Sequence, residues 1–147
     1  MDAGRIRPDD RRGTSRLGFG LNLLIDTHVL LWWWTDERRL SQNARAAIRD
    51  SRNRSYVSAA VAWELAIKVN LGKLDARDVV SNLRQFLIEE GFRRLAISTD
   101  HALRAGLLPM LHRDPFDRML VAQAQASNSP VVSADAIFDR YGVQRIW

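Results

Sequence analysis

The sequence predicts an α/β protein with a mostly parallel sheet of about five strands and helices on both faces. Two observations support this fold class. Short apolar segments alternate along the chain with longer amphipathic ones, and polar capping or turn residues separate them. Strands that alternate with helices pair in parallel and become buried on both faces. The length of 147 residues is that of one domain with a single core.

The expected strands are short runs rich in Val, Ile and Leu, or in Ser, Tyr and Val, each bounded by polar residues. They cover residues 21–25, 55–58, 95–97, 130–133 and 143–146. In a parallel sheet of this kind, ligands bind at the carboxyl ends of the strands. Polar residues that follow these runs are therefore the first candidates for a functional site.

The expected helices show apolar residues at helical spacing or a clear capping signal. They cover residues 27–34, 42–51, 59–71, 79–87, 99–108 and 115–127. Ser41, Ser98 or Thr99, and Asp114 are expected to cap helix starts, and Pro115 favours a first helical position. Gly72 and Gly91 are expected to end helices.

The composition excludes several kinds of chemistry. The chain has no cysteine, so disulfides, thiolate zinc sites and cysteine nucleophiles are absent. No apolar run is long enough to cross a bilayer, and no signal peptide is expected. We therefore expect a cytoplasmic protein with no membrane partner.

The net charge of +5 favours a polyanionic partner such as nucleic acid. Residues 1–16 hold five Arg and three Asp with little apolar content. We expect residues 1–20 to be a disordered or non-native extension and residues 21–147 to be the folded domain. Removing these five Arg and three Asp leaves the folded part with +3, so the charge gives only modest support for nucleic acid.

Four acidic residues are placed where strands end or helices begin: Asp26, Glu64, Asp117 and Asp135. Carboxylates that converge at one edge of a sheet repel one another, and a hard cation such as Mg²⁺ or Mn²⁺ relieves that repulsion. A metal site on a basic protein indicates chemistry on a phosphodiester.

Each acid also has a purely structural explanation. Asp26 and Asp114 are good helix caps, and Asp117 is a favourable acid in a first helical turn. Glu64 stands four residues before Lys68, a spacing that favours a helix ion pair, and Asp135 is a typical turn residue. The signal is the recurrence of all of these acids around one expected sheet edge.

Four segments resemble the motifs of PIN-domain nucleases, specifically the VapC-type toxins of bacterial toxin–antitoxin pairs. They are LIDTHVLLW at 24–32, VSAAVAWELAIK at 57–68, HRDPFDRMLVAQA at 112–124, and VSAD at 132–135 with the ending that follows it. The resemblance covers residues 21–147, and residues 1–20 have no counterpart in it.

The resemblance implies a PIN-like three-layer sandwich and an endoribonuclease that uses Mg²⁺ or Mn²⁺ and is silenced by a cognate VapB-like antitoxin. It implies a catalytic quartet of Asp26, Glu64, Asp117 and Asp135, in which Asp26, Asp117 and Asp135 hold metal. Such proteins often form homodimers. The resemblance and the spacing together give the supporting residues Asp114, Ser133 and Thr27, and the contacts to RNA or antitoxin Arg113, Arg118 and Lys68.

Two other functions compete with this one. A magnesium-dependent phosphatase of the haloacid-dehalogenase type also places an Asp after its first strand, but its Asp-x-Asp signature would require an acid where His28 stands. A non-catalytic PIN-type module that binds RNA or protein has no need for four mutually repelling acids. Cleavage of RNA would indicate the nuclease, hydrolysis of a small phosphate ester would indicate the phosphatase, and neither activity would indicate the binding module.

Overall fold

The computed structural model describes residues 20–147, which form a sheet of five parallel strands in the order β3-β2-β1-β4-β5. Each neighbouring pair is parallel. The strands are β1 (Asn22–Ile25), β2 (Arg54–Ser58), β3 (Arg93–Leu95), β4 (Val131–Val132) and β5 (Arg145–Ile146). The expected α/β class with a mostly parallel sheet is confirmed.

The helices connect the strands in sequence order. They are α1 (Thr27–Thr35), the 3₁₀ helix η2 (Glu37–Arg39), α2 (Gln42–Arg49), α3 (Ala59–Asn70), α4 (Arg77–Glu89), α5 (Thr99–Leu107), α6 (Pro115–Ser127) and α7 (Ile137–Arg140). Within residues 20–147, none of these helices has the length and apolar character needed to cross a bilayer.

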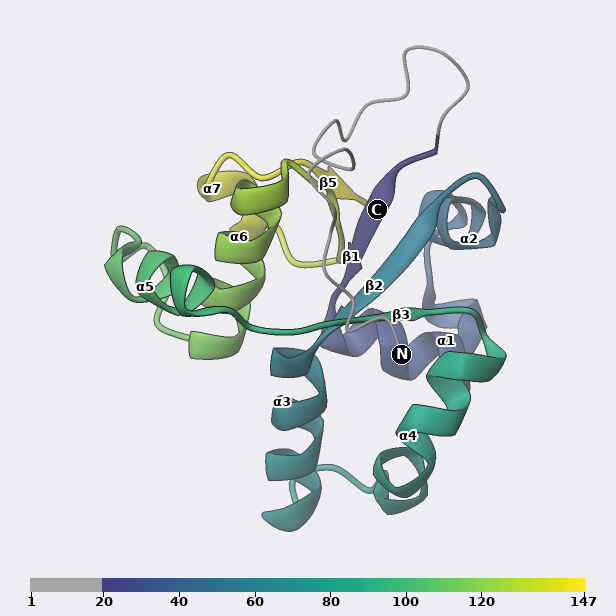
Figure 1. Ribbon diagram of the computed structural model, residues 1–147. Coiled ribbons are helices and arrows are strands. Elements are labelled where there is room, and N and C mark those ends of the chain that lie inside the picture. Colours follow the sequence, from purple (N-terminus) through teal and green to yellow (C-terminus); the bar gives the residue numbers. More distant parts are fainter. Residues whose placement is uncertain (1–19) are drawn as a thin grey trace.

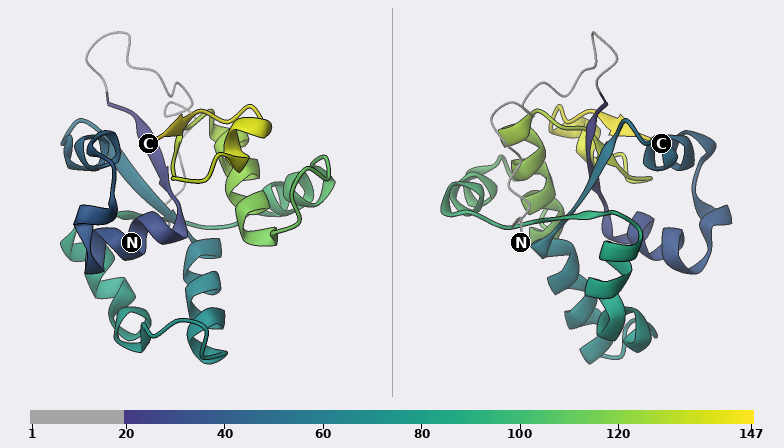
Figure 2. Two further views of the ribbon diagram at one scale, coloured as in Figure 1. Left: turned by 180° about the vertical axis from the view of Figure 1, so that it is seen from behind. Right: turned by 45° about the vertical axis from the view of Figure 1, so that its right-hand side comes forward.

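The helices lie on both sides of the sheet, which gives the three layers that the resemblance implies. Figures 1 and 2 show α1, α2 and α4 on one side and α5, α6 and α7 on the other. Helix α3 projects from the end of β2, beyond the carboxyl edge of the sheet. The amino-terminal turns of α1 and α3 therefore begin at the same edge.

The strand order creates a switch point between β1 and β4. From β1 the chain moves outward to β2 and then β3, and it returns through α5 and α6 to place β4 on the other side of β1. The connections after β1 and β4 leave in opposite directions, so a crevice opens between the carboxyl ends of these two strands. Ligands of open α/β sheets bind at this position.

Several local signals in the sequence specify the helix ends. The side chains of Ser41, Ser98 and Asp114 accept hydrogen bonds from the first turns of α2, α5 and α6. Gly72 and Gly91 take positive φ angles of 71° and 72° directly after the C-caps of α3 and α4. Glycine adopts this left-handed conformation without a Cβ clash, which explains why both helices end there.

The third strand differs from the expected position at residues 95–97. The structure places β3 at Arg93–Leu95, paired with Tyr56, Val57 and Ser58 of β2. Strand β2 ends at Ser58 because α3 begins with the next residue, so residues 96 and 97 have no strand beside them. The short helices η2 and α7 were also not expected. The prediction for residues 1–20 lies outside the described residues, except for Gly20.

The central strand supplies a direct test of the core. Leu24 is fully buried in the middle of β1, whereas Leu107 at the end of α5 is 84% exposed. We expect Leu24→Ala to lower the free energy of unfolding by about 2–5 kcal/mol, because it removes buried methyl groups and leaves a cavity. Leu107→Ala, the matched control, should change it by less than about 0.5 kcal/mol. Urea denaturation measures both; equal losses would contradict the described packing.

Candidate functional site

Asp26 stands at the end of β1 and begins the site. The four residues of β1 are buried, and Asp26 itself is only 6% exposed. Its Oδ1 accepts a hydrogen bond from the Thr27 amide at 2.7 Å, so it caps α1. Its Oδ2 accepts a hydrogen bond from the Ser133 hydroxyl at 2.6 Å. Ser133 follows β4, so this bond ties the two strand ends that border the crevice.

Ser133 also fixes the segment that carries Asp135. The Ser133 hydroxyl oxygen accepts a hydrogen bond from the Asp135 amide at 3.0 Å. The Asp135 carboxylate is exposed and accepts a hydrogen bond from the Ile137 amide at 2.9 Å. Asp135 thus has the turn role that its position suggested, and it also faces the crevice.

Glu64 lies in the second turn of α3 and is 5% exposed. Its Oε1 accepts a hydrogen bond from the Thr27 hydroxyl at 2.6 Å, which links α3 to the start of α1. Its Oε2 is paired with the Lys68 ammonium at 2.5 Å. The hydrogen bond to Glu64 raises the pKa of Lys68 and keeps this lysine charged. The i,i+4 ion pair therefore exists, and it holds a buried carboxylate at the edge of the crevice.

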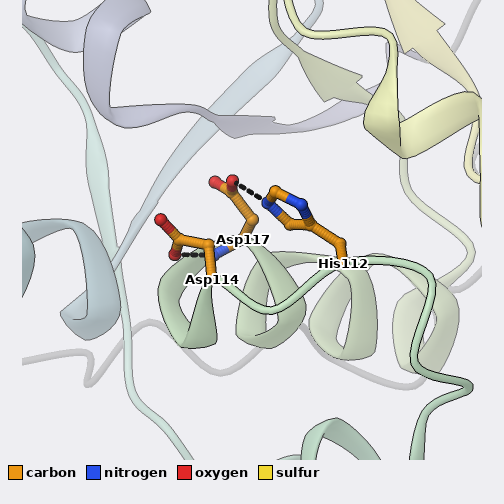
Figure 3. Close-up of side chains that lie close together, drawn as sticks. All are labelled: His112, Asp114 and Asp117. Atoms are coloured by element: carbon orange, nitrogen blue, oxygen red, sulfur yellow. Dashed lines mark hydrogen bonds and ion pairs between the residues drawn. The ribbon is translucent and has the colours of Figure 1, made fainter.

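The start of α6 brings three further ligand-type residues together. Asp114 caps the helix by accepting hydrogen bonds from the amides of Phe116 at 2.8 Å and Asp117 at 3.1 Å. The His112 Nε2 lies 2.8 Å from Oδ2 of Asp117. One ligand-type atom from each of His112, Asp114 and Asp117 lies within 4.8 Å of the others. Figure 3 shows the His112 ring pointing toward Asp117 above the first turn of α6, with Asp114 beside them.

One pocket of about 310 Å³ unites all of these groups. It is lined by Asp26, His28, Trp32, Glu64, Lys68, His112, Asp114, Asp117, Ala134 and Asp135. The structure therefore brings the four acids of the expected quartet to one pocket, together with Asp114 and Lys68. Thr27 and Ser133 do not line the pocket, but their hydroxyls donate hydrogen bonds to Glu64 and Asp26, respectively.

Crowding and burial raise the pKa values of two acids in this pocket, Asp26 and Asp117. Burial raises the pKa of Asp26, although the Ser133 hydrogen bond opposes that rise. Burial raises the pKa of Asp117 to about 6, and the negative charges of Asp114 and Asp26 add to the effect. The hydrogen bond from His112 acts in the opposite direction. Carboxylates that are shifted in this way bind protons or cations more readily than solvated ones do.

The donor set fits a hard divalent cation. Carboxylate oxygens from β1, α3, α6 and the loop after β4 converge, and such oxygens are the ligands that Mg²⁺ and Mn²⁺ prefer. Burial is the main cause of the raised pKa values of Asp26 and Asp117, and neighbouring negative charges add to it, so a cation at this site would be favoured. A larger hollow of about 810 Å³ beside α5 and α6 has a single lining carboxylate, Asp100. It does not share this chemistry.

Arg118 is too buried to make the expected contact with RNA or antitoxin. It is only 7% exposed, and its guanidinium donates to main-chain carbonyls of the segment before α6. A guanidinium that is used in this way is not available to a phosphate or to a partner. Arg113, the other arginine of this motif, is exposed. We therefore correct the expectation for Arg118 and keep Arg113 as a candidate contact.

Sequence reasoning missed the position of His112. No role was expected of His112 from the sequence, and nothing in the pattern indicated that its ring would reach Asp117. The available signal was its place two residues before Asp114 in the third motif. Trp32 is half-buried, and its ring lies 6.0 Å from that of Trp147. It also lines the pocket.

Three comparisons with known proteins agree with this picture. Residues 23–144 match the model of the PIN domain. The chain is 33% identical over 116 residues to Ribonuclease VapC22 of Mycobacterium tuberculosis, a match that covers 77% of this chain and 86% of that protein.

Solved structures share the fold at lower identity. The VapBC2 complex of Rickettsia felis, bound to a DNA fragment from its promoter, contains a chain with a TM-score of 0.62 and 16% identity, covering 86% of this chain and 100% of that one. DNA-bound VapBC from Salmonella typhimurium gives a TM-score of 0.65 and 17% identity, with 85% and 96% covered. Since the family model spans most of the chain and the curated relative exceeds 30% identity, the chain belongs to the PIN domain family.

Proposed function

We propose that this protein is a divalent-metal-dependent endoribonuclease that cleaves RNA phosphodiesters. The observation that carries the proposal is the convergence of Asp26, Glu64, Asp117 and Asp135 on one pocket of a basic PIN-domain protein. The likeness to Ribonuclease VapC22 supports RNA as the substrate. The hard oxygen donors support Mg²⁺ or Mn²⁺ as the metal.

In this proposal Asp26, Asp117 and Asp135 hold the metal. A divalent cation held there would neutralise charge on the phosphate, activate water and orient the in-line attack. Ser133 and Thr27 keep the carboxylates of Asp26 and Glu64 in fixed orientations through their 2.6 Å hydrogen bonds. Asp114 keeps the first turn of α6 in place and adds negative charge beside Asp117.

Glu64 has a separate task in the proposed reaction. It is bound on both sides, by the Thr27 hydroxyl and by Lys68, so its carboxylate has little freedom to reorient. A carboxylate fixed at the rim of the pocket can accept a hydrogen bond from the attacking water and direct it toward the phosphorus. Lys68 and the exposed Arg113 supply the positive charge that attracts the RNA backbone.

The proposed partner is a VapB-like antitoxin, and the proposed assembly is a homodimer in the cytoplasm. The complexes whose toxin chains share this fold support the antitoxin. We expect expression of the chain alone to arrest growth of a bacterial host, and co-expression of an antitoxin gene adjacent to its own gene to restore growth. Growth curves of the two strains measure this. Unimpaired growth with well-expressed, folded protein would argue against a toxin.

The metal-ligand role of Asp26 predicts a selective loss of activity. Asp26→Asn should lower the rate of RNA cleavage by at least about a hundredfold, because it removes a charge that holds the metal. The fold should survive, since an Asn side-chain oxygen can still cap α1. The assay is cleavage of labelled RNA with Mg²⁺ or Mn²⁺, with and without a chelator, alongside a small phosphate ester as substrate.

The matched control for Asp26→Asn is Asp139→Asn. Asp139 is an exposed acid paired with Arg145 outside the pocket. We expect this variant to cleave RNA at the wild-type rate. Full activity of Asp26→Asn, or cleavage of the phosphate ester in place of RNA, would refute the assignment.

The raised pKa of Asp117 predicts a pH dependence of stability in the metal-free protein. Folding raises this pKa to about 6, so the folded state binds the proton more tightly than the unfolded chain does. The resulting stabilisation is complete below about pH 4 and is lost as the pH rises through about 6. Asp117→Asn has no such proton, so its stability relative to wild type should increase over this range. Urea denaturation in a chelating buffer measures it; a constant difference between the two proteins would contradict the shift.

A further inference from the structure

Arg118 is a buried cation whose hydrogen bonds go mainly to backbone carbonyls. It lies in the first turns of α6, beside Asp117 in the sequence, and its guanidinium reaches the segment that joins α5 to α6. It donates to five carbonyl oxygens, two in the last turn of α5 and three in that segment: Ala105 at 2.9 Å, Gly106 at 3.3 Å, Leu108 at 2.9 Å, Pro109 at 3.1 Å and His112 at 3.2 Å.

Two physical effects make this arrangement stable. The last carbonyls of α5 lack partners within their own helix and carry the negative end of its dipole, so they favour a cation. The planar guanidinium offers five N–H donors in a fixed fork, which one side chain can distribute over several carbonyls. Tyr141 adds a second contact, since its hydroxyl accepts a hydrogen bond from Arg118 at 3.4 Å and donates one to Pro109 O at 2.8 Å.

The segment held by Arg118 carries His112. The carbonyl of His112 accepts from Arg118, and its ring contacts the carboxylate of Asp117 at 2.8 Å. Adjacent residues on a helix point about 100° apart, so Asp117 can face the pocket while Arg118 faces the segment behind it. Asp117 and Arg118 are therefore connected in two ways, through the helix backbone and through His112.

We propose that Arg118 is a positioning residue, which fixes the segment between α5 and α6 so that His112 orients the carboxylate of Asp117 for metal binding. Arg118 itself touches neither RNA nor metal. The metal-binding consequence rests on the function proposed above, whereas the fixation of the segment does not. Partners behind a metal ligand typically change metal affinity by about 10–100-fold when they are removed.

The first test follows the segment in metal-free protein. Arg118→Lys retains the charge but cannot reach five carbonyls with one ammonium group. Backbone ¹⁵N order parameters of residues 110–113 should fall below about 0.6 in this variant, while those of β1 and β4 stay near about 0.85. The control is Arg140→Met, because Arg140 is exposed and donates to this segment only at Leu111 O, at 3.3 Å. Unchanged order parameters at residues 110–113 in Arg118→Lys would overturn the proposal.

The second test asks whether Arg118 acts through His112. Isothermal titration of Mn²⁺ compares wild type, His112→Ala, Arg118→Lys and the double variant. Each single variant should bind Mn²⁺ about tenfold more weakly, and the double variant should bind no more weakly than the weaker single one. If the affinity losses of the two single variants multiply in the double variant, the two residues act independently, and the connection through His112 is overturned. If wild-type protein neither binds Mn²⁺ nor cleaves RNA, the proposed function fails, and the order parameters still decide whether Arg118 fixes the segment.

Discussion

The repulsion among carboxylates at one edge of the sheet is the constraint on which the rest of the site depends. Asp26 and Glu64 are almost fully buried, and Asp117 lies near enough to Asp26 for their charges to interact. Buried like charges are costly unless something compensates them. The chain supplies partial compensation through the Ser133 and Thr27 hydroxyls, Lys68 and His112. The pKa values of Asp26 and Asp117 nonetheless stay raised, chiefly because of burial, and a divalent cation held there would offset the remaining repulsion.

The structural explanations for the acids turn out to be compatible with the site. Asp26 caps α1, Asp114 caps α6, Glu64 pairs with Lys68, and Asp135 stabilises a turn. A carboxylate has two oxygens with several lone pairs, so a capping bond does not exhaust it. Capping also fixes the side chain on a rigid element, which improves the precision of a binding site. The same residues thus stabilise local structure and converge on the pocket, so their capping and pairing roles do not weaken the case for a functional site.

The sequence predicted the parts of the molecule that depend on local chemistry. Apolar runs followed by capping residues located β1, α5 and α6, and the ends of parallel strands placed Asp26 and Asp135 at one edge. Errors occurred where long-range pairing decides the outcome. Strand β3 begins two residues earlier than expected, because the end of β2 sets its register. Arg118 was expected to be a contact residue, because sequence reveals charge but not the carbonyls that surround a guanidinium.

The groups around Asp26 separate the three functions that the sequence left open. Phosphatases of the haloacid-dehalogenase type need a second acid two residues later, and here the exposed His28 occupies that position at the pocket rim. A binding module would gain nothing from buried acids, because each costs folding free energy through desolvation. Stability sacrificed at one pocket is expected of a site where charge is needed for chemistry. The pocket therefore favours catalysis over binding alone, and metal-assisted phosphodiester cleavage over phosphatase chemistry.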